Sequence, residues 1–504
     1  MEEVRAVVIG SGFGGAVAAL RLGEAGVDTV VLERGRRWTI EDPTTDATYA
    51  TFERPDGRAE WLSSVTKTPA YEGTPIDVYT GVLDVVTKGG CTFMSGAGVG
   101  GGSQVYGGIL IQPPGELFRR DFPSSIDYDE MDEVYFPRVR SVYPAAPIPD
   151  DILASEQFTG LRVFMEHARK AGFVERDSTA DHQSGMVRFP MAVDWDAVRD
   201  EIDGKRVPSF IAAEFWYGNN SGAKPSLDTN YLRQAEDTGE VEIRPLHVVT
   251  DISQDGDGFL VTADRIDETG VTQERVVLKC EHLFLAAGTF GTTELLFRAR
   301  AKGGLTRIDD SLGEGFGNIG DIFMIRGELA EMTNPHLGGP GCVVVLDLDN
   351  PVAPLSMMRA PLPRFAQDFP DKNVIGAFYF SQTPNRGRLY YDHDADSVEL
   401  EFTPDSDEAA RDLAARLNRA NGGSVVASSD NVTGHQLGGA CMGRTCDTEG
   451  RVLGHPGLYV VDGALLPGSS TCVNPAFTIA AIAERCMDHI LADNIGHSQT
   501  EGTR

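Results

Sequence analysis

Three glycines close to the N-terminus have the type and spacing that hold the pyrophosphate of a dinucleotide. Gly10, Gly12 and Gly15 form a G-x-G-x-x-G motif that directly follows the apolar run at residues 7–9. The first glycine permits a tight turn, the second lets the backbone approach a pyrophosphate, and the third lets a helix pack closely on a strand. The N-terminus of that helix offers unpaired N–H groups and a positive dipole end to the phosphates. The alternative is a glycine-rich turn that binds no ligand.

Glu33 occupies the position at which a dinucleotide-binding unit has an acidic residue. A helical pattern stops at Gly26, residues 29–32 predict a second strand, and Glu33 ends that strand 18 residues after Gly15. A carboxylate at this point accepts hydrogen bonds from a ribose diol and favours an unphosphorylated adenosine ribose, as in FAD or NAD. Because strand, turn, helix, strand and acid occur in this order, the sequence predicts a dinucleotide-binding unit.

A second glycine-rich segment covers residues 94–108. Glycines at this density indicate either backbone packed against a flat or charged group, or a flexible linker. Apolar residues alternate with these glycines, so we expect an ordered contact with a cofactor.

Two later segments repeat the pattern of a strand that enters a turn and then a helix, at residues 282–296 and 457–485. The first predicts that the chain returns to the nucleotide-binding sheet. The second, whose strand ends at Asp462, predicts another helix N-terminus beside a ligand. Asn474 suits the N-cap of that last helix and Pro475 suits its first position.

The remaining segments have the mixed pattern of inserted domains. We expect loops and short elements over 34–88, a helix over 160–171, strands over 241–244 and 248–250 with a hairpin at 255–258, strands over 341–346 and 375–380, and a frayed tail after residue 492.

Composition limits the possible partners. With 504 residues the chain needs two or three structural domains. Its net charge of −31 would repel nucleic acid and anionic membranes. Seven scattered cysteines without C-x-x-C pairs predict neither a zinc site nor a disulfide framework, and we expect no metal. No long apolar run appears anywhere in the sequence, so we expect no membrane span. The N-terminus enters the first strand directly and leaves no room for a signal peptide, so we expect a cytoplasmic protein.

The motifs together resemble the glucose-methanol-choline (GMC) oxidoreductase family, and most closely its non-covalent FAD cholesterol oxidase branch. The resemblance covers nearly the whole chain. Its other motifs are Tyr217–Asn220, Ser226–Asp228, Thr293–Leu296 and Val473–Pro475. The fold that it implies is α/β (α+β overall), with a Rossmann-like FAD-binding domain and an inserted substrate domain built on an antiparallel β-sheet.

The resemblance also implies a division of the chain. The FAD-binding domain would comprise residues 1–40, 88–112, 225–318 and 441–495, the covering loops 41–87, the substrate-binding domain 113–224 and 319–440, and the tail 496–504. The expected FAD contacts are Gly10, Gly12, Phe13, Gly14, Gly15, Glu33, Arg34, Gly96, Gly100, Gly101, Gly102, Ser103, Tyr106, Gly107, Val249, Ala287, Gly288, Asp462, Gly463, Asn474, Pro475 and Phe477. Between Gly96 and Gly108 there is no histidine that could bind the flavin covalently, so we expect non-covalent FAD.

The active-site pair of the family falls on His435 and Asn474. The chemistry implied is oxidation of an alcohol carbon, with the hydride going to flavin N5. His435 can accept or position the hydroxyl proton near neutral pH. Asn474 can orient the hydroxyl, and the dipole of its helix can stabilise negative charge on the reduced flavin. The alternative for His435 is an ordinary structural histidine.

Several positions depart from the cholesterol oxidase branch. Met358 takes the place of the glutamate that isomerises the steroid double bond, and a thioether carries no proton at neutral pH. Tyr106 and Ile109 replace an asparagine and a methionine near the flavin, and Gln436 replaces a proline after His435. We therefore expect these four residues to line a reshaped substrate pocket. An aromatic residue of the branch is likewise replaced, in the segment 433–434.

The function expected is FAD-dependent oxidation of a bulky, apolar secondary alcohol, sterol-like or polycyclic, without the glutamate-dependent isomerisation. The partners are this alcohol and O2 or another electron acceptor. One alternative is a lyase or isomerase on the same scaffold, with a non-redox flavin and His435 as the base. Another is a flavin-binding protein without activity. The sequence leaves open the substrate, the acceptor and the oligomeric state.

Overall fold

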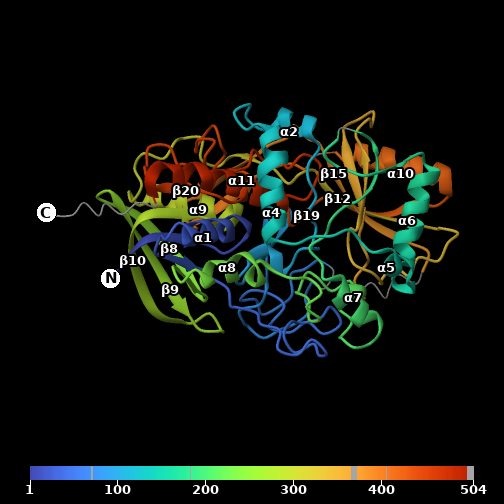
Figure 1. Ribbon diagram of the computed structural model, residues 1–504, viewed down its shortest axis with the longest axis horizontal. Coiled ribbons are helices and arrows are strands. Elements are labelled where there is room, and N and C mark those ends of the chain that lie inside the picture. The colour runs from blue at the N-terminus through green and yellow to red at the C-terminus, as the bar shows by residue number, and fades with distance from the viewer. Residues whose placement is uncertain (70–71, 182, 365–371, 405, 496–504) are drawn as a thin grey trace.

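The computed structural model describes residues 1–69, 72–181, 183–364, 372–404 and 406–495. Two large sheets lie at opposite ends of the long axis, and helix α4 (Phe136–Val142) crosses between them (Figure 1). This mixed α/β architecture confirms the predicted fold class. The expected tail 496–504 lies outside the described residues.

The first sheet is built around the N-terminal strand. Its order is β7-β2-β1-β10-β9-β8, and β20 pairs with β10. Strands β1, β2, β7, β10 and β20 pair in parallel, and β8 and β9 form an antiparallel extension. Their bounds are β1 Glu2–Ile9, β2 Thr29–Leu32, β7 Val241–Arg244, β8 His247–Asp255, β9 Gly258–Ile266, β10 Thr272–Leu285 and β20 Leu458–Val460. The hairpin predicted at 255–258 is confirmed as the turn that joins β8 to β9.

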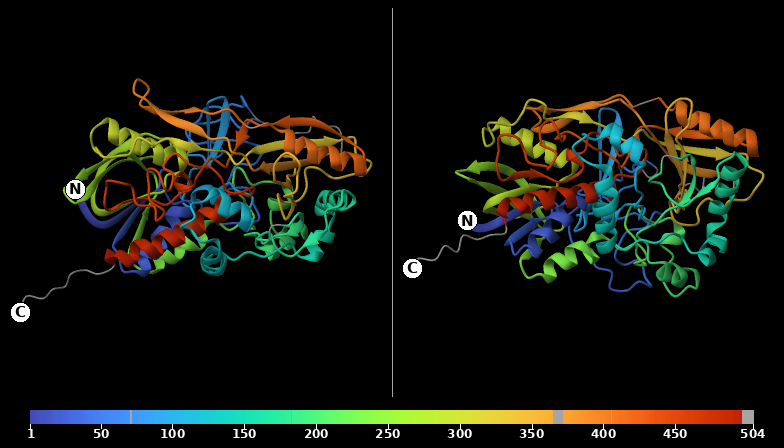
Figure 2. Two further views of the ribbon diagram at one scale, coloured as in Figure 1. Left: turned by 90° about the horizontal axis from the view of Figure 1, so that it is seen from above. Right: turned by 45° about the horizontal axis from the view of Figure 1, so that its top comes forward.

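Helices cover this sheet: α1 (Phe13–Glu24), α8 (Tyr231–Asp237), α9 (Gly288–Ala301) and α11 (Ala476–Ile490). In α1 the small residues Gly14, Gly15 and Ala16 are buried, which lets its backbone come close to the strands. Helix α11 packs against α1 and α4 (Figure 2). The carboxyl ends of β1, β10 and β20 therefore meet at one edge beneath the helix N-termini.

The second sheet is antiparallel except for one edge pair, with the order β18-β12-β15-β14-β13-β6-β5. Its bounds are β5 Glu175–Arg176, β6 Gly185–Arg188, β12 Asp321–Gly327, β13 Val343–Asp347, β14 Leu355–Arg359, β15 Ile375–Ser381 and β18 Ser424–Ser429. Helices α6 (Thr159–Lys170) and α10 (Glu408–Asn421) lie against its outer face (Figure 1). The helix predicted at 160–171 and the strands predicted at 341–346 and 375–380 correspond to α6, β13 and β15.

The register of the second sheet places an acid and several apolar side chains on one face. Asp321 lies opposite Phe380, Phe323 lies opposite Phe378, and Phe378 lies opposite Met358. Because side chains alternate along a strand, these five project to the same side.

A small sheet connects the two halves. Strands β3 (Leu83–Lys88), β4 (Cys91–Gly96) and β19 (Val432–Thr433) pair in the order β19-β4-β3. This pairing brings the chain that follows Thr433 beside the start of the glycine-rich segment. The other elements are α2 Gly115–Asp121, α3 Tyr128–Glu130, α5 Asp150–Ala154, α7 Trp195–Ile202, β11 Glu314–Phe316, β16 Gly387–Asp392 and β17 Ser397–Glu401.

One local prediction is wrong. Helix α11 begins at Ala476, so Pro475 is its N-cap and Asn474 lies one position further out, with no side-chain cap bond. The Asn474 amide instead contacts a residue of another segment, described below. A tertiary contact has replaced the local capping bond that the sequence suggested.

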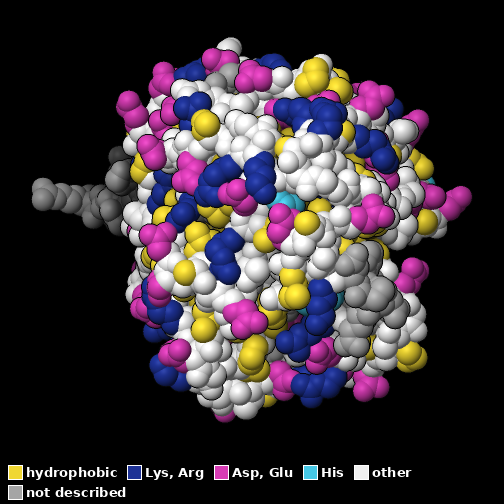
Figure 3. Space-filling view, turned by 90° about the vertical axis from the view of Figure 1, so that its right-hand side faces the viewer, with side chains coloured by type: hydrophobic (Ala, Val, Ile, Leu, Met, Phe, Trp, Pro, Cys, Tyr) yellow, Lys and Arg dark blue, Asp and Glu magenta, His cyan; other side chains and the backbone are white. Residues whose placement is uncertain are grey.

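The surface is mixed in charge. On the end of the molecule seen in Figure 3, acidic and basic side chains are interspersed and hydrophobic ones are scattered. Within the described part of the chain, every helix is too short or too polar to cross a lipid bilayer.

Candidate active site

The first glycine turn is packed so tightly that side chains are excluded. Gly10 has φ +95°, and a Cβ there would overlap the carbonyl group of Ala286. A Cβ on Gly15 would overlap the Gly10 carbonyl, and one on Gly14 would overlap that of Val461. These glycines therefore join α1 to the ends of β1, β10 and β20, as the motif predicts.

Gly12 is different because it faces open space. A Cβ on Gly12 would meet no atom within 4 Å, and the same holds for Gly102 in the second glycine-rich segment. The two segments meet at Gly101, whose Cβ would lie 2.6 Å from the Gly12 Cα. Gly12 is also the N-cap of α1 and supplies no side chain to its free N–H groups. This glycine-lined cradle at a helix N-terminus fits the pyrophosphate of FAD.

Glu33 is buried at the end of β2, 5% exposed. Its Oε2 accepts hydrogen bonds from the Ser11 N–H at 3.1 Å and the Ser11 hydroxyl at 2.6 Å, and its Oε1 accepts from the Gly35 N–H at 2.9 Å. Glu33 thus holds the glycine turn against the second strand. The remaining lone pairs of the carboxylate can accept from a ribose diol.

Asp462 joins the two later segments that the sequence singled out. Its Oδ2 accepts from the Gly288 N–H at 2.7 Å and the Thr292 hydroxyl at 2.6 Å, and its Oδ1 accepts from the Ala464 N–H at 2.9 Å. Burial raises the pKa of Asp462 to about 6. The carboxyl group links the end of β20 to the start of α9.

His435 and Asn474 are in direct contact. The Asn474 Nδ2 lies 3.0 Å from the His435 Nε2, and the other ring nitrogen, Nδ1, lies 2.7 Å from the Asp321 Oδ2. The imidazole stands between an amide from the start of α11 and a carboxylate from the start of β12. The Phe380 ring meets it edge to face, with centroids 5.2 Å apart.

Asp321 was not predicted as a site residue. It is 3% exposed and also accepts a hydrogen bond from the Thr433 hydroxyl at 2.8 Å. The Thr433 oxygen in turn accepts from the His435 N–H at 2.9 Å. No spacing in the sequence connects Asp321 to His435, because 114 residues separate them and only the sheet brings them together.

The four residues expected in the substrate pocket lie in different surroundings. Met358 is buried on the face of the second sheet that carries Phe378 and Asp321. The Gln436 amide donates to the Ser95 hydroxyl at 2.7 Å, and its Oε1 is buried without a hydrogen-bond partner among the described residues.

Tyr106 and Ile109 continue the glycine-rich segment. The Tyr106 hydroxyl donates to that of Tyr143 at 2.6 Å, and its ring packs edge to face on Phe13. Its phenol is therefore already engaged, and the ring is the part that can contact a flavin. Ile109 is buried, and its backbone forms an isolated antiparallel β-bridge with that of Met191.

The other expected FAD contacts lie around the same edge of the first sheet. Arg34 forms an ion pair with Asp84 at 2.8 Å. The Phe477 ring is buried against Phe136 and Arg140, so only its backbone can face the cradle. Val249 lies on β8, Ala287 is the N-cap of α9, Gly463 begins a 3-10 turn, and Gly96, Gly100, Ser103 and Gly107 belong to the end of β4 and the glycine-rich segment.

A cavity of about 480 Å³ borders the glycine-rich segment at Gln104. Residues of four segments line it, among them Arg37, Tyr49, Gln104 and Lys224. The Lys224 Nζ donates to the Ser103 and Gln104 carbonyls, both at 2.9 Å, and lies over the Tyr106 ring. Burial lowers the pKa of Lys224 to about 7.

Comparison with known proteins agrees with this architecture. Residues 393–483 match the family model described as GMC oxidoreductase. A cholesterol oxidase of Mycobacterium tuberculosis is 26% identical over 95% of this chain and 89% of its own length, and a paromamine 6'-oxidase of Streptomyces fradiae is 23% identical over 97% and 91%. The crystal structure of pyridoxine 4-oxidase from Mesorbium loti superposes with a TM-score of 0.65 at 14% identity, over 97% of this chain and 99% of that one.

The glycine-lined first sheet joined to a second, antiparallel sheet defines an FAD-dependent oxidoreductase that acts on CH–OH groups. Residues 393–483 carry the GMC oxidoreductase domain, the whole chain is similar to GMC-type oxidases, and FAD is the cofactor that this similarity indicates.

Proposed function

We propose that this protein oxidises a bulky, apolar secondary alcohol to a ketone, with His435 as the acceptor of the hydroxyl proton. The observation that carries the proposal is the arrangement of His435 between Asn474 and Asp321, 3.0 and 2.7 Å from the two ring nitrogens. Bound FAD would supply the acceptor for the hydride that leaves the alcohol carbon.

Side chains of the protein take up the hydroxyl proton of the alcohol. The Asp321 carboxylate accepts from Nδ1, so the lone pair of Nε2 is the one that can take the hydroxyl proton as the C–O bond becomes a carbonyl. Asn474 lies beside that nitrogen, and its Oδ1 is buried without a hydrogen-bond partner among the described residues. That oxygen is an available acceptor for orienting the hydroxyl group of the substrate.

The surroundings of His435 favour an apolar substrate. Phe323, Phe378, Phe380 and Met358 project from the same face of the second sheet as Asp321. Phe323 and Phe378 are only partly buried, as expected for the wall of a pocket. Aromatic and thioether side chains bind flat hydrocarbon surfaces well, whereas a strongly polar substrate would leave its hydrogen bonds unmade. The similarity to cholesterol oxidases points the same way.

Two finer features belong to the proposal. A double-bond isomerisation of the glutamate-dependent kind is absent, because Met358 occupies the expected position and has no titratable group. The FAD is bound without a covalent link, because residues 96–108 include no histidine.

The proposal is tested by product analysis with a 3β-hydroxysterol and a polar polyol as competing substrates. We expect the sterol to give its ketone with the double bond unmoved, so that the ultraviolet band of a conjugated enone does not develop. Preferential oxidation of the polyol would refute the apolar substrate class, and an enone band would refute the lack of isomerisation.

A further inference from the structure

We infer that Asp321, held by Thr433, is a positioning residue that fixes the orientation and the tautomer of His435. This role rests on the proposed function of His435 as proton acceptor. Neither Asp321 nor Thr433 touches the reacting atoms, so both act through the imidazole.

The hydrogen bonds form a closed ring. Asp321 Oδ2 accepts from His435 Nδ1 at 2.7 Å and from the Thr433 hydroxyl at 2.8 Å, while the Thr433 oxygen accepts from the His435 N–H at 2.9 Å. An ionised carboxylate can only accept, so this network assigns the ring proton to Nδ1. The Nε2 lone pair then faces the Asn474 amide and the substrate side.

The charge of Asp321 has few other partners. It is 3% exposed, and its Oδ1 has no hydrogen-bond partner among the described residues. Its one ion pair in the described part of the chain is with His435. Asp430 lines the same small crevice and adds no positive charge.

An imidazolium at His435 would therefore be the nearest compensating charge for a buried carboxylate. Opposite charges at hydrogen-bond distance attract each other, and a low-dielectric environment strengthens the attraction. As the hydroxyl proton arrives at Nε2, Asp321 would stabilise the product of that transfer. The alternative is a purely structural link between β12 and β19.

Asp321→Asn separates these roles, because it keeps the shape and removes the charge. In anaerobic stopped-flow mixing of the holoenzyme with a 3β-hydroxysterol, we expect the flavin to bleach about 10–10³-fold more slowly in this variant. We also expect part of the His435 population in this variant to carry its ring proton at Nε2, since an asparagine amide can donate to Nδ1 as well as accept from it. A structural link alone would leave the tautomer unchanged.

Two further variants sharpen the test. Asp430→Asn makes the same chemical change on the same crevice without touching His435 and should leave the rate and the tautomer unchanged. Thr433→Val keeps the carboxylate but removes one of its hydrogen bonds, so the rate should fall while the ring proton of His435 stays at Nδ1. Equal rates and the same tautomer for wild type and Asp321→Asn would overturn the inference.

A spectroscopic measurement needs no turnover. In ¹⁵N-histidine NMR of the resting holoenzyme, assigned by the resonance lost in His435→Asn, we expect the neutral tautomer protonated at Nδ1. Protonation at Nε2 instead would overturn the inference. If no alcohol bleaches the wild-type flavin, the proposed function fails, and this tautomer measurement alone decides the role of Asp321.

Discussion

The side-chain amide of Asn474 lies 3.0 Å from Nε2 of His435, although 39 residues separate the two in sequence. Asn474 precedes α11 of the FAD-binding half, and His435 follows β19, which connects to the substrate half. Their contact thus sets the proposed catalytic pair at the junction of the two sheets. A cofactor held by one half and a substrate held by the other can meet there.

Removing the imidazole should stop proton transfer without releasing the cofactor. We expect His435→Ala to lower the rate of flavin bleaching by an alcohol about 10²–10⁴-fold, because a general base is lost. Its FAD content should equal that of wild type, as measured by the visible absorbance of the purified protein. The matched change at the exposed His393 should have no effect, and an unchanged rate in His435→Ala would remove His435 from the mechanism.

Filling the glycine cradle should prevent FAD binding, whereas His435→Ala should leave FAD bound. Gly12→Val adds side-chain atoms where the structure leaves open space, so the fold is kept while the pyrophosphate site is blocked. We expect a folded protein by circular dichroism with little or no bound FAD. Gly14→Ala should instead impair folding, because its Cβ would overlap the Val461 carbonyl. A fully flavinated Gly12→Val protein would show that the pyrophosphate lies elsewhere.

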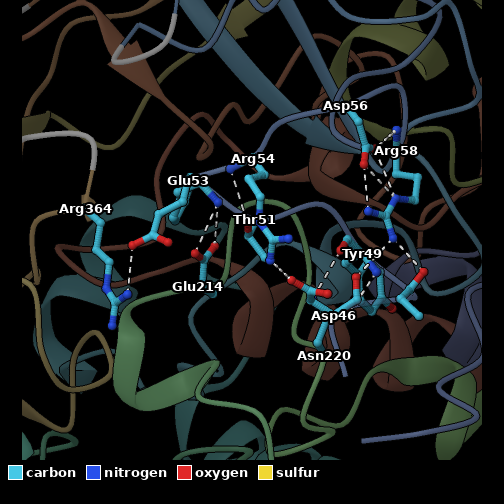
Figure 4. A network of polar contacts seen from close by, with 12 residues as sticks. Asp46, Tyr49, Thr51, Glu53, Arg54, Asp56, Arg58, Glu214, Asn220 and Arg364 are labelled. Carbon is cyan, nitrogen blue, oxygen red and sulfur yellow. Dashed lines mark hydrogen bonds and ion pairs between the residues drawn. The ribbon is translucent and has the colours of Figure 1, made fainter. Parts of the chain in front are cut away.

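Glu214 makes stability depend on pH in the loops that cover the site. It accepts from the Phe52 N–H at 3.1 Å and lies close to Glu53, which is ion-paired with Arg364 at 2.8 Å (Figure 4). Burial raises the pKa of Glu214 to about 8, against an ordinary value of 4.5. The folded state then binds more protons than the unfolded state between these values, so this contribution to stability is lost as pH rises from 4.5 to 8.

The measurement for Glu214 is the apparent unfolding temperature of wild type and Glu214→Gln from pH 5 to pH 9. Wild type should lose stability relative to the variant across that range. The same comparison with Glu41→Gln, an exposed carboxyl group, serves as the control. A constant difference between wild type and Glu214→Gln would contradict the protonated state of this side chain.

Lys224 should make the stability of the protein rise with pH, the reverse of the trend expected for Glu214. Burial lowers its pKa from 10.5 to about 7, so between these values the unfolded state binds more protons and stability rises with pH. Wild type should therefore gain stability relative to Lys224→Met from pH 7 to pH 10.5. Lys170→Met, a half-exposed lysine, is the control. A difference that does not change with pH would mean that Lys224 keeps its charge at all these values.

The dinucleotide-binding unit could be predicted because its determinants are local. The glycine spacing, the apolar strands and Glu33 all lie within the first 33 residues and act through turn geometry and helix dipoles. The helix over 160–171 and the strands over 341–346 and 375–380 could be predicted from periodicity for the same reason. The pair His435 and Asn474 was found only through resemblance to a family, because no local rule connects them.

The site features that could not be predicted from the sequence depend on strand register and on tertiary contacts. Asp321 reaches His435 because β12 and β19 enter the site side by side, and the spacing of these residues along the chain gives no sign of it. Capping was predicted for Asn474, but the contact with His435 occupies its amide. Likewise, the phenol of Tyr106 is bound by Tyr143, a residue that no motif contains.

The most direct test of the account is anaerobic stopped-flow reduction of the holoenzyme by a 3β-hydroxysterol, unlabelled and deuterated at the alcohol carbon. The account predicts that both substrates bleach the visible flavin bands and that deuterium slows the bleaching several-fold, because that C–H bond breaks in the measured step. Flavin bands that stay intact with the sterol and with a series of other polycyclic alcohols would contradict it.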